Sequence, residues 1–179
     1  SGSKSINLGG MSTSTPVVCN GRAYVGVAGT GGQFTPYGGH HIAVIDLTDW
    51  KVAYTAQTQG YPQTSGLMTT GYDDGVYVYF MDNYTPGAMR LNLEAPGQTA
   101  LEGVTEEFTS DKGVSGTYTD CAPVVFTPRG SLAQYCIGSP VTDEYGTLYF
   151  KNDSGNRIAL TSAVRELKVA EEPEIARTE

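Results

Sequence analysis

The 179-residue sequence is short of positive charge and of histidine. It has 11 Lys and Arg against 19 Asp and Glu, which gives a net charge of −8, and 2 His. This balance repels a phosphate backbone and no basic cluster offsets it, so we expect no nucleic-acid partner. Two histidines leave little general-base chemistry at neutral pH, and the chain has no GxSxG motif or catalytic Cys–His–Asp spacing. We therefore expect the chain not to be an enzyme.

Long apolar runs and metal-binding cysteine motifs are also missing. No stretch of about 18 apolar residues occurs, so we expect no membrane insertion. The cysteines, Cys19, Cys121 and Cys136, lack CxxC and CxxH spacing, which argues against a zinc site. Cys121 and Cys136 flank an expected hairpin. A disulfide across it and two buried free thiols are both compatible with the spacing, and free thiols are the simpler interpretation.

The N-terminal stretch SGSKSINLGG lacks the basic and apolar regions of a secretion signal. A native start normally carries Met, so we interpret the chain as a trimmed or internal fragment, and the missing signal carries no information on localisation. Residues 1–10 are expected to form a flexible N-terminal extension. Residues 168–179 are charged, lack aromatic side chains and are expected to form a flexible tail. A single β domain then spans residues 11–167.

Glycine and tyrosine are abundant, at 23 and 12 residues, which favours turns and strands over helices. Short motifs that favour tight turns separate apolar runs, and each predicts a hairpin. They lie at Asn20-Gly21, Asp74-Gly75, Pro128 to Gly130 and Tyr145-Gly146. At the third turn the expected strands are APVVF (122–126) and SLAQYCI (131–137). The short interval between Gly130 and Gly146 leaves open whether these two strands instead close one unit.

Further strands are expected between these hairpins. Residues 40–48 and 50–59 pair through a turn at Thr48-Asp49, and residues 89–94 and 156–162 occupy the third-strand position of their units. Helical periodicity is nearly absent. Only residues 100–108 and 161–170 have a pattern that suits a turn or two of helix.

Residues 138–162 echo residues 13–29. Both have a small residue and Pro, a β-branched pair, a turn that ends in Gly and an aromatic-rich apolar run. A recurring unit of short strands is typical of β-propeller blades, whereas a sandwich gives alternation without a repeated phrase. We therefore predict an all-β fold of propeller-like antiparallel blades in an incomplete propeller, with a β-sandwich as the alternative.

Residues 43–55, AVIDLTDWKVAYT, resemble the closing phrase of a blade in the PQQ-like, or quinoprotein-type, β-propeller repeat family. Asp49 replaces the usual turn Gly, and Tyr54 takes the position of the docking Trp. Residues 139–160 likewise resemble the opening of such a blade. The resemblance implies about three blades, whereas a closed ring of this family has about six to eight. The residues that match the closing phrase are Ile45-Asp46, Thr48 and Lys51-Val52.

Three blades would leave the ring open and its sheet edges unpaired. The chain is then part of a longer propeller, a free-standing arc, or half of an assembly that a second copy completes. The expected partners on this interpretation are a second copy in a homodimer or the remaining blades of a longer parent chain. Enzymes of this family hold a quinone and calcium at the ring centre, but no residue here matches those ligands. The resemblance therefore implies no cofactor.

His40 and His41 follow the glycine-rich segment 29–39. Histidine is the commonest metal ligand, but neighbouring residues on a strand point to opposite faces, so we interpret the pair as an ordinary strand start and expect no metal site. The glycine-rich segment lacks the GxGxxG and GxxxxGK patterns and is interpreted as a long loop, where rigid folds often carry binding function. Carboxylate clusters such as Asp143-Glu144 lie at expected turns and are interpreted as turn residues rather than calcium ligands.

Several aromatic side chains lie outside the expected strand interiors and offer flat surfaces on which sugars or peptides stack. Tyrosine is also a favoured packing residue of strands, so both interpretations stay open for these positions. Together with the two histidines they form the candidate ligand-binding set, which is Tyr37, His40, His41, Trp50, Tyr72 and Tyr84.

These observations predict a non-catalytic β-propeller-like repeat module of a bacterial secreted or cell-surface protein. The module would act as a scaffold or as a binding surface for protein or carbohydrate. The bacterial origin and the extracellular or cell-surface location are implied by the resemblance and by a polar, weakly charged, tyrosine-rich surface. Two alternatives stay open. One is a fragment of a quinoprotein dehydrogenase whose other blades supply the cofactor ligands, and the other is a self-assembly module that pairs through exposed blade edges.

Overall fold

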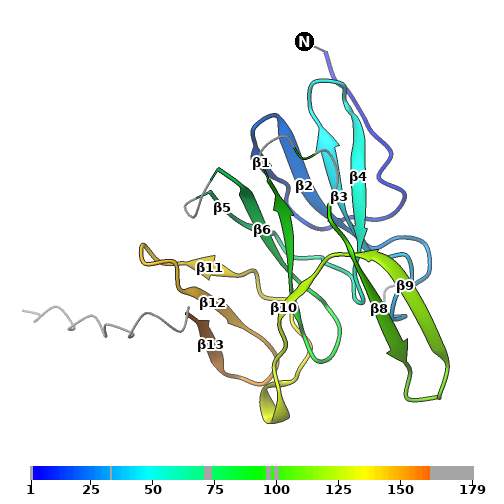
Figure 1. Cartoon of the computed structure of the whole chain (residues 1–179), viewed down its shortest axis with the longest axis vertical. Helices are drawn as coiled ribbons and strands as arrows, with labels where there is room; N and C mark the ends of the chain where they lie inside the picture. The colour runs from blue at the N-terminus through cyan, green and yellow to red at the C-terminus, as the bar shows by residue number, and fades with distance from the viewer. Residues whose placement is uncertain (1, 33, 71–73, 96–97, 99–100, 162–179) are drawn as a thin grey trace, which may run out of the picture.

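The computed structural model describes residues 2–32, 34–70, 74–95, 98 and 101–161 (Figure 1). Their strands form separate sheets in which all but one of the strand pairs are antiparallel, and none of the sheets closes into a barrel. The expected all-β class is therefore confirmed, and the arrangement is consistent with an incomplete propeller as well as with a sandwich. In the described residues, no helix has the length and hydropathy that crossing a membrane requires.

The first sheet has six strands in the order β1-β2-β3-β4-β9-β8. The first four follow one another in the chain and form an antiparallel meander. The β8–β9 hairpin comes from much later in the sequence and joins the outer edge, where β9 pairs in parallel with β4 at Cys121 and Gln57. The strand bounds are Val17–Cys19 (β1), Arg22–Val27 (β2), His41–Asp46 (β3), Lys51–Gln57 (β4), Val104–Thr109 (β8) and Ser115–Cys121 (β9).

The second sheet has four strands in the order β10-β7-β6-β5, and the third has three in the order β11-β12-β13. Both are antiparallel meanders, and the β8–β9 hairpin is an insertion between the third and fourth strands of the second sheet. The second-sheet strands are Leu67–Thr69 (β5), Val76–Met81 (β6), Met89–Glu94 (β7) and Val124–Phe126 (β10). The third-sheet strands are Val141–Thr142 (β11), Leu148–Lys151 (β12) and Arg157–Leu160 (β13).

Three of the four expected hairpins are present. Asn20 and Gly21 both have positive φ, 48° and 75°, as the tight turn between β1 and β2 requires. The β5–β6 and β11–β12 pairs lie around the second and fourth turn motifs. The repeated phrase therefore marks the first two strands of the first sheet and of the third sheet. The expected third strands, over residues 89–94 and 156–162, correspond to β7 and β13.

The third hairpin prediction is wrong in its second strand. Residues 122–126 contain β10, which closes the second sheet, but residues 131–137 contain no strand. Gly130–Leu132 instead forms a short 3₁₀ turn, in which the N–H of Ala133 donates to the carbonyl of Gly130. The physical reason is topological, because this segment carries the chain from the second sheet to the third, where the N–H of Asp153, just after β12, donates to the Tyr135 carbonyl at 3.0 Å.

The helical expectation for residues 100–108 is also wrong. Val104–Thr109 forms β8, which pairs with β9, a strand that the sequence analysis did not predict. Along β8 only Glu106 and Phe108 are half-buried, which is the two-residue period of a strand. Pairing with β9 therefore outweighs the local helical pattern of the sequence. The other helical expectation, over 161–170, lies outside the described residues apart from Thr161.

The second sheet packs between the other two sheets. Val76, Val78 and Phe80 of β6 lie in one buried cluster with Tyr24 and Ile42 of the first sheet. The alternate residues of the same strand face the other way, in a second cluster with the third sheet. That cluster contains Tyr79, Met81, Met89, Cys136, Phe150 and Ile158. Because successive strand residues point to opposite faces, one apolar strand serves two interfaces.

The outer face of the first sheet is covered by the start of the chain. Ile6 and Leu8 pack against a small cluster that contains Ala23, Val25 and Ile45. Residues 1–10 were expected to be a flexible extension, and the structure places this part of them against the sheet.

The three cysteines are free thiols. Cys121 ends β9 in the first sheet, whereas Cys136 is buried between the second and third sheets, so the two do not face each other across a hairpin. Burial raises the pKa of the Cys121 thiol to about 11. A thiol in this environment is unreactive at neutral pH.

Candidate functional site

Both histidines are held by main-chain carbonyls. The buried His40 ring lies with Nδ1 2.6 Å from the Ala28 oxygen and Nε2 2.9 Å from the Thr35 oxygen. His41 Nδ1 lies 2.8 Å from the Gly39 oxygen, and its Nε2 lies 3.2 Å from the Leu8 oxygen. The two rings therefore hydrogen-bond to different segments of the chain and do not face a common site. Over the described residues, no group of three His, Cys, Asp or Glu side chains is arranged to hold a metal ion.

Tyr37 is used for packing. It adopts a φ of 52°, its hydroxyl donates to Glu106 Oε2 at 2.6 Å, and its ring stacks on Tyr118 at 3.8 Å between centroids. Burial, and then the hydrogen bond to the carboxylate, raise the pKa of this hydroxyl well above its ordinary value. One face of the ring is therefore already occupied, and Tyr37 instead ties the glycine-rich loop to the β8–β9 hairpin.

The remaining aromatic candidates lie apart from one another. Trp50 sits in the β3–β4 turn with Lys4 Nζ 5.8 Å from its ring centroid, at the opposite end of β3 from His41. Tyr84 precedes the cis Thr85–Pro86 bond. Tyr72 lies outside the described residues. The sequence-based candidates thus do not assemble into one site.

A buried charge cluster that the sequence analysis did not identify lies between the second sheet and the β8–β9 hairpin. The Arg90 side chain is only 1% exposed, and its Nε contacts Asp82 Oδ2 at 2.6 Å. Its Nη1 and Nη2 contact the two oxygens of Glu106 at 2.9 and 3.0 Å, and Nη1 also donates to the Ala122 carbonyl at 2.7 Å. This two-point contact fixes β8 relative to β7. The available signal was a charged residue inside the strand pattern MRLNLE.

A second polar cluster joins the first and second sheets. Glu94 Oε2 accepts hydrogen bonds from the hydroxyls of Tyr24 at 3.3 Å and Tyr54 at 2.9 Å, and Glu94 Oε1 pairs with Arg22 Nε at 3.1 Å. Asn92 Nδ2 donates to the Tyr54 hydroxyl at 3.1 Å. Tyr54, which stands at the position of the docking Trp in the family resemblance, therefore connects one sheet to the next.

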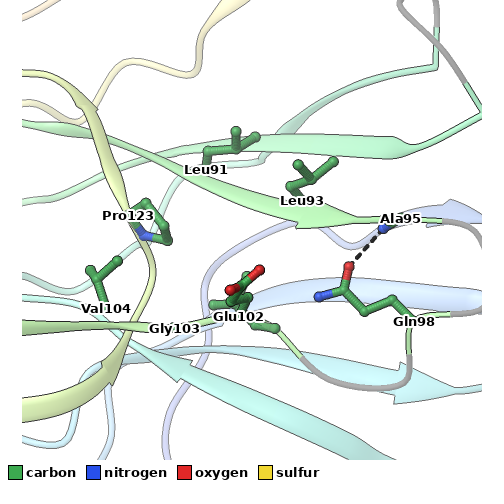
Figure 2. A pocket seen from close by; sticks show the side chains of 9 residues that line it. Leu91, Leu93, Ala95, Gln98, Glu102, Gly103, Val104 and Pro123 are labelled. Atoms are coloured by element: carbon green, nitrogen blue, oxygen red, sulfur yellow. Dashed lines mark hydrogen bonds between the residues drawn. The ribbon is translucent and has the colours of Figure 1, made fainter.

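A groove of about 380 Å³ opens at the seam between these sheets (Figure 2). This volume falls within the range of about 300 to 1,000 Å³ that is usual for ligand sites. Leu91 and Leu93 of β7 lie along one wall, and Glu102 and Val104 lie across from them. Pro123 closes one end of the groove. The described lining consists of Leu91, Leu93, Ala95, Gln98, Leu101, Glu102, Gly103, Val104 and Pro123.

Two features produce this groove: the side chains of β7 point alternately to its two faces, and the Arg90 cluster holds β8 nearby. Residues 90, 92 and 94 contact the first sheet and the β8–β9 hairpin, so Leu91 and Leu93 face the other way and remain only half-buried. The Arg90–Glu106 contact holds the beginning of β8 opposite them. Glu102 is the only ionisable side chain in the described lining, which otherwise supplies apolar surface and one amide. Such a lining is suited to binding by shape and apolar contact.

Another hollow, of about 510 Å³, lies at the β12–β13 turn. Most of its lining is turn and exposed polar surface, with Lys151 and Arg157 directly opposite each other on the two strands. It lacks the apolar walls of the groove beside β7. The groove is therefore the stronger candidate site.

No protein-family model matches the chain, and no curated protein matches it. The PQQ-like resemblance thus rests on the residues quoted for it, and function has to be argued from the groove and its surroundings.

Proposed function

We propose that the chain is a recognition module without catalytic activity, and that it binds a segment of another protein in the groove beside β7. The proposal places the module in a bacterial secreted or cell-surface protein, on the family resemblance and on the polar, weakly charged composition. The observation that carries it is the apolar groove itself, formed by Leu91, Leu93, Leu101, Val104 and Pro123.

The chemistry of the lining favours protein over carbohydrate as the bound partner. Sugar sites use aromatic platforms together with several hydrogen-bonding side chains, whereas the described lining contains no aromatic ring. Aliphatic walls instead suit the side chains of a peptide. The aromatic residues considered from the sequence, Tyr37 and Trp50, have their rings in contact with other parts of the chain.

The test is a selection of random linear heptapeptides, displayed on phage, against the immobilised full chain. A parallel selection uses Leu93→Asp, which places a charge on the wall of the groove. We expect a family of apolar peptides that is enriched about tenfold or more on the natural chain and not on the variant. Burying a carboxylate against an apolar ligand costs several times the thermal energy, which accounts for the expected difference.

Val114→Asp is the matched control, because Val114 is 70% exposed in the β8–β9 turn and does not line the groove. It should retain the enriched peptides. If the natural chain and Leu93→Asp enrich the same peptides, or if neither enriches any, the groove is not a peptide site and the proposal is wrong.

Self-assembly is the second candidate, favoured by a specific observation on the third sheet. Val141 and Tyr145 are 58% and 57% exposed, and the register places Val141, Tyr149 and Ala159 in one row across the outward face of β11, β12 and β13. An exposed apolar row of this kind suits contact with another sheet. Its test is the dependence of molecular mass on concentration.

A further inference from the structure

The groove lies beside a strand edge that is only partly paired. β7 pairs with β6 along its full length, from Met89 to Glu94. On its other side, β10 pairs only with Met89 and Arg90, and the N–H of Leu91 donates to the Pro123 carbonyl at 3.0 Å. No described strand continues this pairing toward Glu94.

The chain before Pro123 turns away to the first sheet, and this divergence opens the groove. The N–H of Ala122 donates to the Gln57 carbonyl of β4 at 2.9 Å. The residues before Pro123, which would otherwise extend β10 along β7, are therefore hydrogen-bonded to the first sheet instead. No described strand pairs with the end of β7 on this side, and the groove opens there (Figure 2).

The main chain of Leu93 points into this space. Alternate residues of a strand direct their N–H and C=O groups to the same edge. Because the N–H of Leu91 points toward Pro123, the N–H and C=O of Leu93 point the same way, beyond the place where the pairing stops. An unpaired strand edge of this kind is a template for another extended segment.

The remaining feature of the groove is its charge. The Glu102 side chain is exposed, and it makes no ion pair among the described residues. The described lining contains no basic side chain, so nothing in it neutralises the carboxylate. A bound segment with a basic side chain opposite Glu102 would supply the missing charge.

We propose that the groove binds an extended protein segment as an added strand on β7, and that it prefers a segment in which a Lys or Arg is flanked by apolar residues. The added strand exchanges main-chain hydrogen bonds with Leu93, its apolar side chains pack on Leu91 and Val104, and its basic side chain faces Glu102. This inference rests on the proposed function and specifies the class of ligand and its mode of binding.

The experiment uses the enriched heptapeptides, resynthesised with acetylated and amidated ends and a fluorescent label, and measures their affinity for the full chain by anisotropy. Each peptide is also made as a series in which one amide at a time is N-methylated. Methylation of an amide that pairs with Leu93 should weaken binding about 3- to 10-fold, the worth of one hydrogen bond, whereas methylation at alternate positions should have little effect.

The charge preference is tested with Glu102→Gln. We expect this variant to bind Lys- or Arg-containing peptides about 2- to 5-fold more weakly at low salt, with the difference vanishing at high salt, and to bind neutral peptides as before. Glu107→Gln, which removes an exposed carboxylate of β8 outside the described groove lining, is the matched control and should change neither.

The outcomes separate the two proposals. If peptides bind and Leu93→Asp abolishes binding, but no N-methylation matters, the added-strand mode is wrong and the proposed function stands. Equal affinities of Glu102→Gln and the natural chain for basic peptides contradict the charge preference. If no peptide is enriched on the natural chain over Leu93→Asp, the proposed function fails and this inference fails with it.

Discussion

Arg90 shows how a single side chain positions the candidate site. Its guanidinium is enclosed by the carboxylates of Asp82 and Glu106 and the carbonyl of Ala122, at distances of 2.6 to 3.0 Å. Desolvation works against the charge of Arg90, but the two carboxylates outweigh it and raise the pKa of the guanidinium further. The contacts join β7 to the end of β6 and to β8, and the groove opens between β7 and β8. Removing one member of such a cluster leaves the others buried without a partner.

We predict that Arg90→Met lowers the free energy of unfolding by about 3 to 5 kcal/mol, since it leaves the buried Asp82 and the half-buried Glu106 without a positive partner. Urea denaturation measures the change. Arg157→Met on the exposed surface of β13 is the matched control and should stay within about 0.5 kcal/mol. If Arg90→Met is too unstable to purify, Glu106→Gln tests the same cluster with a smaller loss. Equal stabilities for Arg90→Met and Arg157→Met would contradict a structural role for the cluster.

Individual residues differ in how far the sequence predicts their environment. Asn20-Gly21 was predicted correctly because its turn depends on local backbone preferences alone. Gly26 could not be interpreted in this way. A Cβ there would lie 1.6 Å from the Pro62 carbonyl oxygen, a contact between segments far apart in the chain. Arg90 and Glu106 are likewise distant in sequence, so neither their pairing nor the groove beside them has a local signal.

At the scale of elements, the meanders were predictable and the insertion was not. Residues 89–94 were expected as a strand and form β7 with those bounds, because the alternation of apolar and polar residues in MRLNLE acts locally. The β8–β9 hairpin lies in the chain between β7 and β10 of the second sheet but joins β4 of the first sheet, and that choice depends on a partner edge that local sequence does not encode. The groove needs this hairpin as its second wall, so it could not be foreseen either.

The β3–β4 turn gives a prediction about pH. Asp46 Oδ1 accepts hydrogen bonds from the N–H of Asp49 at 3.0 Å and of Thr48 at 2.8 Å, and these bonds lower the pKa of the carboxyl below its ordinary value of 3.8. A lowered folded-state pKa means that the stabilisation is complete above that ordinary value and is lost as the pH falls through the folded-state pKa. Asp46→Asn should therefore be less stable than the natural chain near neutral pH and equal to it in acid.

Urea midpoints of both chains between about pH 7 and about pH 3 measure this difference. Asp111→Asn, in the exposed turn between β8 and β9, is the control for the general effect of removing one negative charge. A gap between the natural chain and Asp46→Asn that stays constant over the whole range would show that the turn does not depend on the carboxylate.

At the scale of the whole molecule, the two ends of the stack differ. The outward face of the first sheet is covered by Ile6 and Leu8, whereas the third sheet presents the Val141–Tyr149–Ala159 row outward. The sequence predicted an all-β chain of antiparallel strand pairs correctly, because each tight turn is encoded by neighbouring residues. The sequence did not indicate that Ile6 and Leu8 cover the first sheet, because two apolar residues in the polar stretch SGSKSINLGG form no periodic pattern.

This asymmetry predicts how the chain associates. If a second copy completed a ring, it would have to pack on the outer face of the first sheet, where Ile6 and Leu8 already lie. We therefore expect the double variant Ile6→Ser/Leu8→Ser to bare the Ala23, Val25 and Ile45 cluster and to associate more strongly than the natural chain. Light scattering on a sizing column, over a concentration series, measures the change in mass. Asn7→Ser, in the same segment with its side chain exposed, should behave as the natural chain does. If the natural chain forms a dimer and the double variant has the same mass at every concentration, association uses another surface. The exposed row of the third sheet would then be the surface to alter next.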